Sequence, residues 1–167
     1  MQGGMILSSE LAMKIDKIID HLRKKINPRC IVLADISGRV ISTYVAKNNI
    51  DVTSLAALFA SNIGATGAIA EKIQETSGFD TIMQEGKNFN VFLSKVKNSY
   101  ILAVVFSRSE QVGMVRLFTK KACDNLVEIA SEYEKQNSQK LNGKTFQHFS
   151  GQLAEQLSSI LKDSDSA

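Results

Sequence analysis

The chain has 167 residues, enough for one domain of ordinary size to bury a core without metal ions or disulfide bonds. Apolar residues make up 44% of it and charged residues 22%, which is typical of soluble globular proteins and excludes a disordered chain or a fibre. The net charge of +3 comes from basic and acidic residues that are interspersed, whereas nucleic-acid binding usually needs clustered positive charge, so we expect no nucleic-acid partner.

The first predicted element is an amphipathic helix that ends at Asn27-Pro28. Apolar residues recur at helical spacing over residues 11–26, Ser8 or Ser9 can cap the helix, and Glu10 lies in its first turn. This pattern predicts a helix with one face turned towards a core.

Two strands and a long helix are predicted next. Residues 30–34 form a continuous apolar run rich in strand formers, so we expect both faces of that strand to be covered. Residues 35–38 are typical of a turn, and residues 39–45 return as a second strand. Asp51 is a good N-cap for a helix that extends to about residue 75, before Ser77-Gly78 breaks it.

Three further strand-like runs follow, over residues 79–83, 88–95 and 100–106. Their connections are too short for parallel crossovers, so we expect an antiparallel meander with the first run at an edge of the sheet. Residues 107–110 have capping-box spacing, and the apolar pattern after them predicts another amphipathic helix to about Tyr133.

The last part of the chain predicts a linker and a short helix. Residues 136–144 are polar and helix-poor, and residues 145–167 hold an amphipathic helix and an acidic tail. The apolar stripe of that helix consists of Phe146, Phe149, Leu153, Leu157 and Ile160. Residues 1–135 are then one α+β domain of three layers, in which five antiparallel strands carry one helix on one face and two on the other.

No pattern of catalytic or cofactor-binding residues stands out. The histidines, His21 and His148, lie on helical segments far apart, and with Cys30 and Cys123 they lack the spacing of zinc ligands. Residues 142–145 contain part of a phosphate-binding loop, but no strand precedes them and the first glycine is missing. The Gly64-Ala65-Thr66-Gly67 sequence superficially matches the short glycine loop of an RNA-binding module, but it lies inside a strong helical pattern, so we discount this match. We therefore expect no metal, no cofactor and no active site.

The cysteines and the first residues predict the compartment. Cys30 and Cys123 each lie in an apolar segment, which is compatible with a reducing environment. Residues 1–5 carry no basic leader followed by a long apolar run. We expect no secretory signal, no membrane insertion and a cytoplasmic location.

The helix predicted from residue 51 is crowded with small side chains. A stripe of larger residues should pack on the sheet: Leu55, Phe59, Ile63, Thr66, Ala70 and Ile73. The small residues are Ala56, Ala57, Ala60, Ser61, Gly64, Ala65, Gly67 and Ala68, and five of them cluster on one face: Ala57, Ala60, Ser61, Gly64 and Ala68. Each glycine inside a helix costs roughly 1 kcal/mol relative to alanine, so a close contact should compensate. That contact is made either with another molecule or with another part of the same chain.

The edge strand offers a route to a dimer. An open edge can pair with the same edge of a second copy, and a symmetric dimer would place the two small-residue helices side by side. The residues expected at this interface are Gly67, Phe79, Thr81, Ile82 and Met83.

Several short stretches share their order and spacing with one protein family. They are Ile31-Val32-Leu33-Ala34-Asp35 with Gly38, Asn49-Ile50-Asp51 with Thr53-Ser54-Leu55-Ala56, Gln84-Glu85-Gly86, and Gly113-Met114-Val115-Arg116-Leu117 with Lys120-Lys121-Ala122. Together they span about residues 10–133. On these residues the chain resembles the Roadblock/dynein light chain family, and more closely its bacterial MglB-type members.

The resemblance implies a profilin-like Roadblock fold and a homodimer that binds a small Ras-like GTPase of the MglA type. MglB-type proteins activate such GTPases, which set cell polarity and motility in bacteria, and they supply no arginine finger. Arg116 is therefore expected to be an ordinary helix residue. The residues expected to contact the GTPase are Ala57, Ala60, Ser61, Gly64, Ala65 and Ala68.

Three functions remain open on the sequence. The first is activation of GTP hydrolysis by reorganising the GTPase's own catalytic residues. The second is a scaffold dimer that binds a GTPase or another partner without changing its turnover. The third, an enzyme, is disfavoured by the missing nucleophile, metal and phosphate sites. The helix predicted after residue 144 can bind the GTPase, bind another partner or fold back on its own domain.

Overall fold

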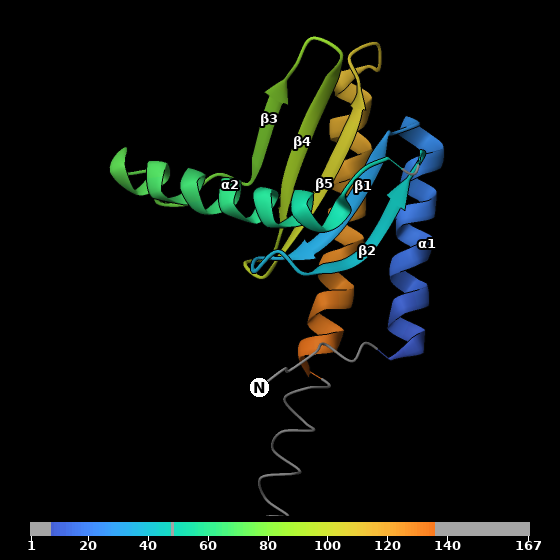
Figure 1. The fold of residues 1–167 in the computed structure, drawn as a ribbon. Coiled ribbons are helices and arrows are strands. Elements are labelled where there is room, and N and C mark those ends of the chain that lie inside the picture. Colours follow the sequence, from blue (N-terminus) through green and yellow to red (C-terminus); the bar gives the residue numbers. More distant parts are fainter. Residues whose placement is uncertain (1–7, 48, 136–167) are drawn as a thin grey trace, which may run out of the picture. The chain divides into compact units, whose positions relative to one another are not determined.

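The computed structural model describes residues 8–47 and 49–135 (Figure 1). Contacts divide the chain into one compact unit of residues 1–129 and a second of residues 130–167. The fold is that of the first unit. The linker predicted over residues 136–144 and the amphipathic helix predicted after it lie outside the described residues.

Helix α1 spans Ser9–Ile26. Its N-cap is Ser8, whose hydroxyl accepts a hydrogen bond from the backbone N–H of Leu11 at 3.3 Å. It ends where Asn27 adopts a left-handed conformation and donates its backbone N–H to the carbonyl of Arg23, a common way to close a helix. The predicted helix is therefore confirmed, with Ser8 rather than Ser9 as its cap.

Five antiparallel strands form one sheet, in the order β2-β1-β5-β4-β3. The strands are β1 (Cys30–Asp35), β2 (Val40–Val45), β3 (Thr81–Glu85), β4 (Phe89–Val96) and β5 (Tyr100–Ser107). The central β1 is buried along its whole length, as its continuous apolar run predicts. The meander of β3, β4 and β5 is confirmed, and β3 lies at the edge.

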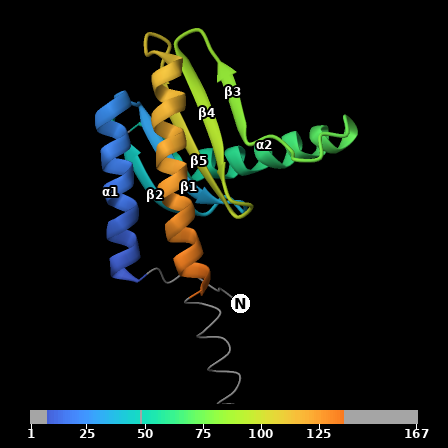
Figure 2. The same cartoon turned by 180° about the vertical axis from the view of Figure 1, so that it is seen from behind.

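Helices cover both faces of the sheet, so the predicted three-layer fold is confirmed. Helix α2 (Val52–Lys72) lies on one face, and α1 and residues 112–129 of the next helix lie on the other (Figures 1 and 2). Residues 112–129 of that helix belong to the first unit and are called here the 112–129 helix. Alternate residues of β1 serve two cores. Val32 packs with α2, whereas Ile31 and Leu33 pack with α1 and the 112–129 helix.

Three sequence-based boundaries are wrong. Helix α2 ends at Lys72 rather than near residue 75, and Ile73, expected to pack on the sheet, is 61% exposed because the end of α2 extends past the sheet (Figure 1). Residues 107–110 form a turn instead of a capping box, and the helix after them begins at residue 112. The third boundary is that of the edge strand. Phe79 precedes β3, since Gly78 has a φ of +67° and the chain is still turning there.

Candidate interaction surface on helix α2

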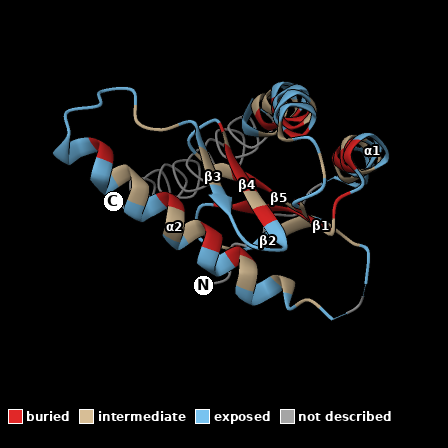
Figure 3. Cartoon of the chain, turned by 90° about the horizontal axis from the view of Figure 1, so that it is seen from above, coloured by how far each residue is buried: buried red, intermediate tan, exposed pale blue. Residues whose placement is uncertain are grey.

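The small residues of α2 are split between two faces of the helix. Its N-cap is Asp51, which accepts a hydrogen bond from the backbone N–H of Ser54 at 3.1 Å. The buried residues are Ala56, Phe59, Ile63 and Ala70. Ala57, Ser61, Gly64, Ala65 and Ala68 are all exposed, while Ala60 is half-buried. Figure 3 shows exposed residues along the side of α2 that faces away from the sheet. The predicted small-residue face therefore points away from the sheet.

The two glycines inside α2 border open space. A Cβ atom added at Gly64 or at Gly67 would meet no atom of the described chain within 4 Å. Close packing within the described residues therefore does not explain why glycine occupies these positions. Each glycine still costs roughly 1 kcal/mol of helix stability relative to alanine.

Ala57 differs from the glycines because the chain does approach it. A Cβ at Gly38, in the turn between β1 and β2, would lie 2.8 Å from the Cα of Ala57. This close approach to backbone atoms of Ala57 accounts for the glycine at position 38. Of the two explanations that the sequence left open, contact with another part of the same chain fails for Gly64 and Gly67 within residues 8–47 and 49–135.

Large apolar side chains also lie exposed on α2, a feature that sequence reasoning missed. Leu58 is 63% exposed and Ile69 56%. With Ile73 they flank the small-residue face, and together these three residues are called here the apolar flank. Ile69 and Ile73 are four residues apart and so lie one turn from each other, and adjoining exposed apolar side chains of this kind can mark an interaction site. The signal was present in the sequence, because Leu58 and Ile69 fall outside the stripe that packs on the sheet.

By length and composition alone, α2 is also apolar enough to cross a membrane. One such helix is weak evidence of a membrane span, because the core helix of a soluble protein passes the same test. Four residues of α2 are buried: Ala56, Phe59, Ile63 and Ala70.

Strand β3 pairs with β4 on one side and with no other strand of the described residues on its other side. Its register places Thr81 opposite Ser94 and Ile82 opposite Leu93 of β4. The carbonyl of Asp80 accepts the backbone N–H of Lys95 at 2.9 Å, which makes this a hydrogen-bonded pair. In an antiparallel ladder hydrogen-bonded and non-hydrogen-bonded pairs alternate, so the next pair, Thr81 and Ser94, is not hydrogen-bonded. The N–H of Thr81 therefore points away from β4. The interface residues predicted at 81–83 thus belong to an edge that can accept another strand.

Three of the features that the sequence analysis weighed for chemistry can be located in the described residues. Within residues 8–47 and 49–135 no group of three His, Cys, Asp or Glu side chains could bind a metal ion. His21 is exposed on α1, and residues 64–67 lie inside α2, so they do not form the glycine loop of an RNA-binding module. His148 and the 142–145 sequence fall outside the described residues. Arg116 is an exposed helix residue.

The two cysteines are free and buried. Burial raises the pKa of both thiols, that of Cys123 to about 11. A thiol with a raised pKa is a poor nucleophile at neutral pH, so neither cysteine is suited to catalysis.

The fold and the outward helix define a class of protein. Residues 14–106 match the Roadblock/LC7 domain, and the chain belongs to this family. The structure is similar to MglB from Myxococcus xanthus, with 36% sequence identity and a TM-score of 0.68 over 71% of this chain and 96% of that one.

Two other structures share the fold at lower identity. One is an MglB with a tetrameric arrangement, at 24% identity and a TM-score of 0.74 over 80% of this chain and 99% of that one. The other is the gliding protein MglB of Thermus thermophilus, at 23% identity and a TM-score of 0.73 over 79% of this chain and 99% of that one. A comparison with curated protein sequences finds no match.

Proposed function

We propose that this protein acts in the cytoplasm as a homodimer that stimulates GTP hydrolysis by a small Ras-like GTPase of the MglA type, and so controls bacterial polarity or motility. The observation that carries the proposal is the outward face of α2, where Gly64 and Gly67 border open space. The 36% identity to an MglB supports the choice of partner. The protein supplies binding energy rather than a catalytic group.

The proposed mechanism is a shift in the population of GTPase conformations. A dimer that binds the hydrolysis-competent arrangement more tightly than the others raises its population and therefore the rate. Small side chains at Ser61, Gly64 and Ala68 let a switch segment of the GTPase approach the helix backbone closely. Charge stabilisation in the transition state then comes from the GTPase and its Mg²⁺ ion.

The dimer is proposed to form through the β3 edge and the end of α2 nearest to it. The unpaired N–H of Thr81 favours strand pairing, and the exposed Ile69 and Ile73 supply apolar area for a second copy. This arrangement leaves the small-residue face of both α2 helices free for the GTPase. Gly67, half-buried on α2, lies in the interface expected from the sequence.

The test is single-turnover GTP hydrolysis by the small GTPase encoded beside this protein, or by an MglA if there is none. Gly64→Arg and Ala68→Arg should each abolish stimulation, because an arginine side chain holds the partner away from the helix. Gly113→Arg is a matched control, since Gly113 is also exposed and open but lies on the 112–129 helix. It should leave stimulation intact.

Three results would count against the proposal. Unchanged stimulation by both variants would remove the α2 face from the mechanism. Loss of stimulation in the Gly113→Arg control would show that the effect is not local. Binding of the GTPase without any change in its rate would identify a scaffold instead of an activator. Circular dichroism and the oligomeric mass of each variant check that the fold and the dimer persist.

A second contact with the GTPase is proposed for the apolar stripe of the last helix, which lies outside the described residues. Its members are Phe146, Phe149, Leu153, Leu157 and Ile160. Changing Phe146 and Phe149 together to serine should weaken GTPase binding without altering the dimer, because an amphipathic helix binds a groove through its apolar face. Unchanged affinity would limit the interaction to α2.

A further inference from the structure

A groove runs between α1 and the 112–129 helix, on the face of the sheet opposite to α2. Its cavity volume is about 230 Å³. The lining residues are Lys17, Ile18, His21 and Leu22 of α1, and Phe118, Lys121, Ala122 and Asn125 of the 112–129 helix. These eight residues are called here the basic groove.

The floor of the basic groove is apolar. Leu22 and Ala122 are buried in the core, and Ile18 and Phe118 are partly buried against it. Met114 and Leu117, which are exposed on the same helix as Phe118, extend the apolar surface by one turn. An apolar side chain from another molecule could therefore lose water on entering this groove.

The walls of the basic groove are cationic, and none of its eight residues is acidic. Lys17 of α1 lines one wall and Lys121 of the 112–129 helix lines the other. Lys121 lies 5.5 Å from the centre of the Phe118 ring, and Lys25 lies 5.9 Å from the same centre. The ring thus holds two ammonium groups near the groove.

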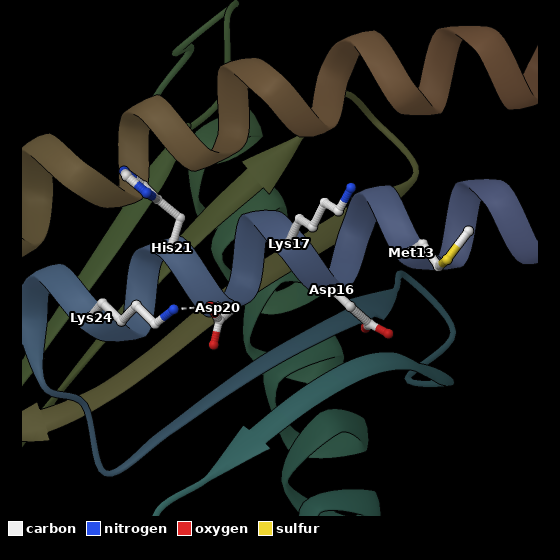
Figure 4. A pocket seen from close by; sticks show the side chains of 6 residues that line it. All are labelled: Met13, Asp16, Lys17, Asp20, His21 and Lys24. Carbon is white, nitrogen blue, oxygen red and sulfur yellow. Dashed lines mark ion pairs between the residues drawn. The ribbon is translucent and has the colours of Figure 1, made fainter.

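The carboxylates of α1 are directed away from the basic groove. Figure 4 shows Lys17 and His21 pointing towards the 112–129 helix, while Asp16 and Asp20 point towards the opposite side. Asp16 accepts a hydrogen bond from the hydroxyl of Ser42 on β2, at 2.8 Å. Asp20 is paired with Lys24 and Arg23, each at 2.6 Å. Asp16 and Asp20 are therefore engaged by Ser42, Arg23 and Lys24, and the hollow that they line with Lys17 and His21 lies beside the basic groove.

We infer that the basic groove binds an acidic amphipathic segment of a partner protein, at a site separate from the α2 surface. Such a segment would place apolar side chains over Phe118 and Leu22 and its carboxylates beside Lys17 and Lys121. The partner segment should be negatively charged, because opposite charges across an interface give specificity and faster association. The partner segment should be elongated, because a groove between two helices accommodates a helix or an extended segment along its length.

Other occupants fit less well. The cavity volume is below the range of about 300–1,000 Å³ that is usual for small-molecule sites. The surfaces assigned to the dimer and the GTPase lie on α2 and β3 rather than here. A membrane binds protruding apolar side chains on a basic face and would reach the exposed Met114 and Leu117, but it would not reach Leu22 and Ala122, which are buried.

The test uses the full chain and two synthetic peptides, measured by fluorescence anisotropy. Both peptides carry leucine at helical i, i+3, i+4 and i+7 positions, and one has glutamate and the other lysine at the remaining positions. We expect the glutamate peptide to bind and its affinity to fall at least about tenfold between about 0.05 M and about 0.5 M salt. Lys17→Glu with Lys121→Glu should weaken that binding by at least about tenfold.

Lys47→Glu with Lys87→Glu is the matched control, since both of these lysines are exposed and lie outside the groove. This pair should bind the glutamate peptide like the unchanged protein. Stimulation of GTP hydrolysis should be the same with and without the Lys17 and Lys121 changes, which separates this inference from the proposed function. Circular dichroism confirms that both double variants are folded.

Several outcomes would overturn the inference. They are failure of the glutamate peptide to bind, equal affinity for the lysine peptide, or an equal loss in the control pair. Binding that appears only when Phe146 and Phe149 are changed to serine would show that the chain's own last segment occupies the groove. Lys17-dependent binding to vesicles of phosphatidylserine and phosphatidylcholine, without peptide binding, would identify a membrane surface instead.

Discussion

Gly38 lies directly against Ala57. The glycine is in the turn between β1 and β2 with a φ of +85°, and a Cβ there would be 2.8 Å from the Cα of Ala57 in α2. The turn itself is held by Asp35, whose backbone carbonyl accepts the N–H of Gly38 at 2.9 Å. This contact joins the turn to the first half of α2 and thereby helps to place the outward face of the helix.

Gly38→Ala should lower the free energy of unfolding by at least about 1–3 kcal/mol, because the left-handed backbone disfavours a side chain and the methyl group collides with Ala57. Urea denaturation at a fixed protein concentration measures the change. Gly113→Ala is the control, since a Cβ at Gly113 meets nothing within 4 Å. A neutral Gly38→Ala would mean that the turn moves away from α2 at little cost.

Gly64→Ala should have the opposite effect on stability. The position is exposed and helical, so removing the conformational freedom of glycine should stabilise the free protein by about 0.5–1 kcal/mol. Thermal unfolding without the GTPase should show a higher Tm. A lower Tm would show that another part of the chain or a second copy packs closely on Gly64.

Thr81→Pro should break the proposed dimer and leave the sheet of each subunit folded. The N–H of Thr81 points out of the sheet, so proline at this position removes the donor offered to a second copy and none used by β4. Light scattering should give the mass of a monomer, whereas Thr81→Val, which keeps the N–H, should remain a dimer. A dimeric proline variant would rule out pairing through this edge.

Asp35→Asn should destabilise the protein at neutral pH by about 1–3 kcal/mol. The Asp35 carboxylate accepts the backbone N–H groups of Ser37 at 2.9 Å and Arg39 at 3.0 Å, the Ser37 hydroxyl, and Arg39 Nε at 2.7 Å. An asparagine has one acceptor oxygen in place of two and sets its amino group against a donor.

The effect of Asp35→Asn should also depend on pH. Burial alone would raise the pKa of Asp35, but the hydrogen bonds from Ser37 and Arg39 outweigh it, so the pKa lies below its ordinary value. The stability gained from the carboxylate is therefore present above the ordinary Asp pKa of about 3.9 and lost as the pH falls through the lower folded pKa. Unfolding measured from pH 7 downwards should show the two proteins converging. A constant difference would assign the effect to shape rather than charge.

The sequence predicted the elements of this fold because local periodicity was strong. The unbroken apolar run at the start of β1 indicated a strand covered on both faces, and Asp51 marked the start of α2 correctly. The edge position of β3 also followed from the sequence, because short connections allow only a meander. The predicted start of β3 at Phe79 was wrong because a turn precedes the strand. That turn depends on the positive φ of Gly78, which a pattern of apolar residues does not reveal.

The candidate surface was predicted only in part. Spacing along α2 placed Gly64 and Ala68 on one face, but it could not say whether that face was covered, and it assigned Ile73 to the sheet. The apolar flank at Leu58 and Ile69 and the groove between α1 and the 112–129 helix depend on where helices end and how they pair.

The sequence by itself determined which residues share a face of each helix or strand, because that follows from the 3.6-residue and two-residue repeats of the backbone. Only the tertiary structure decided which faces are covered. In the folded chain Gly38 contacts Ala57, Gly64 borders open space, and Lys17 and Lys121 line the same groove. These arrangements depend on residues that are far apart in the sequence, and a local repeat of apolar residues carries no information about such pairs.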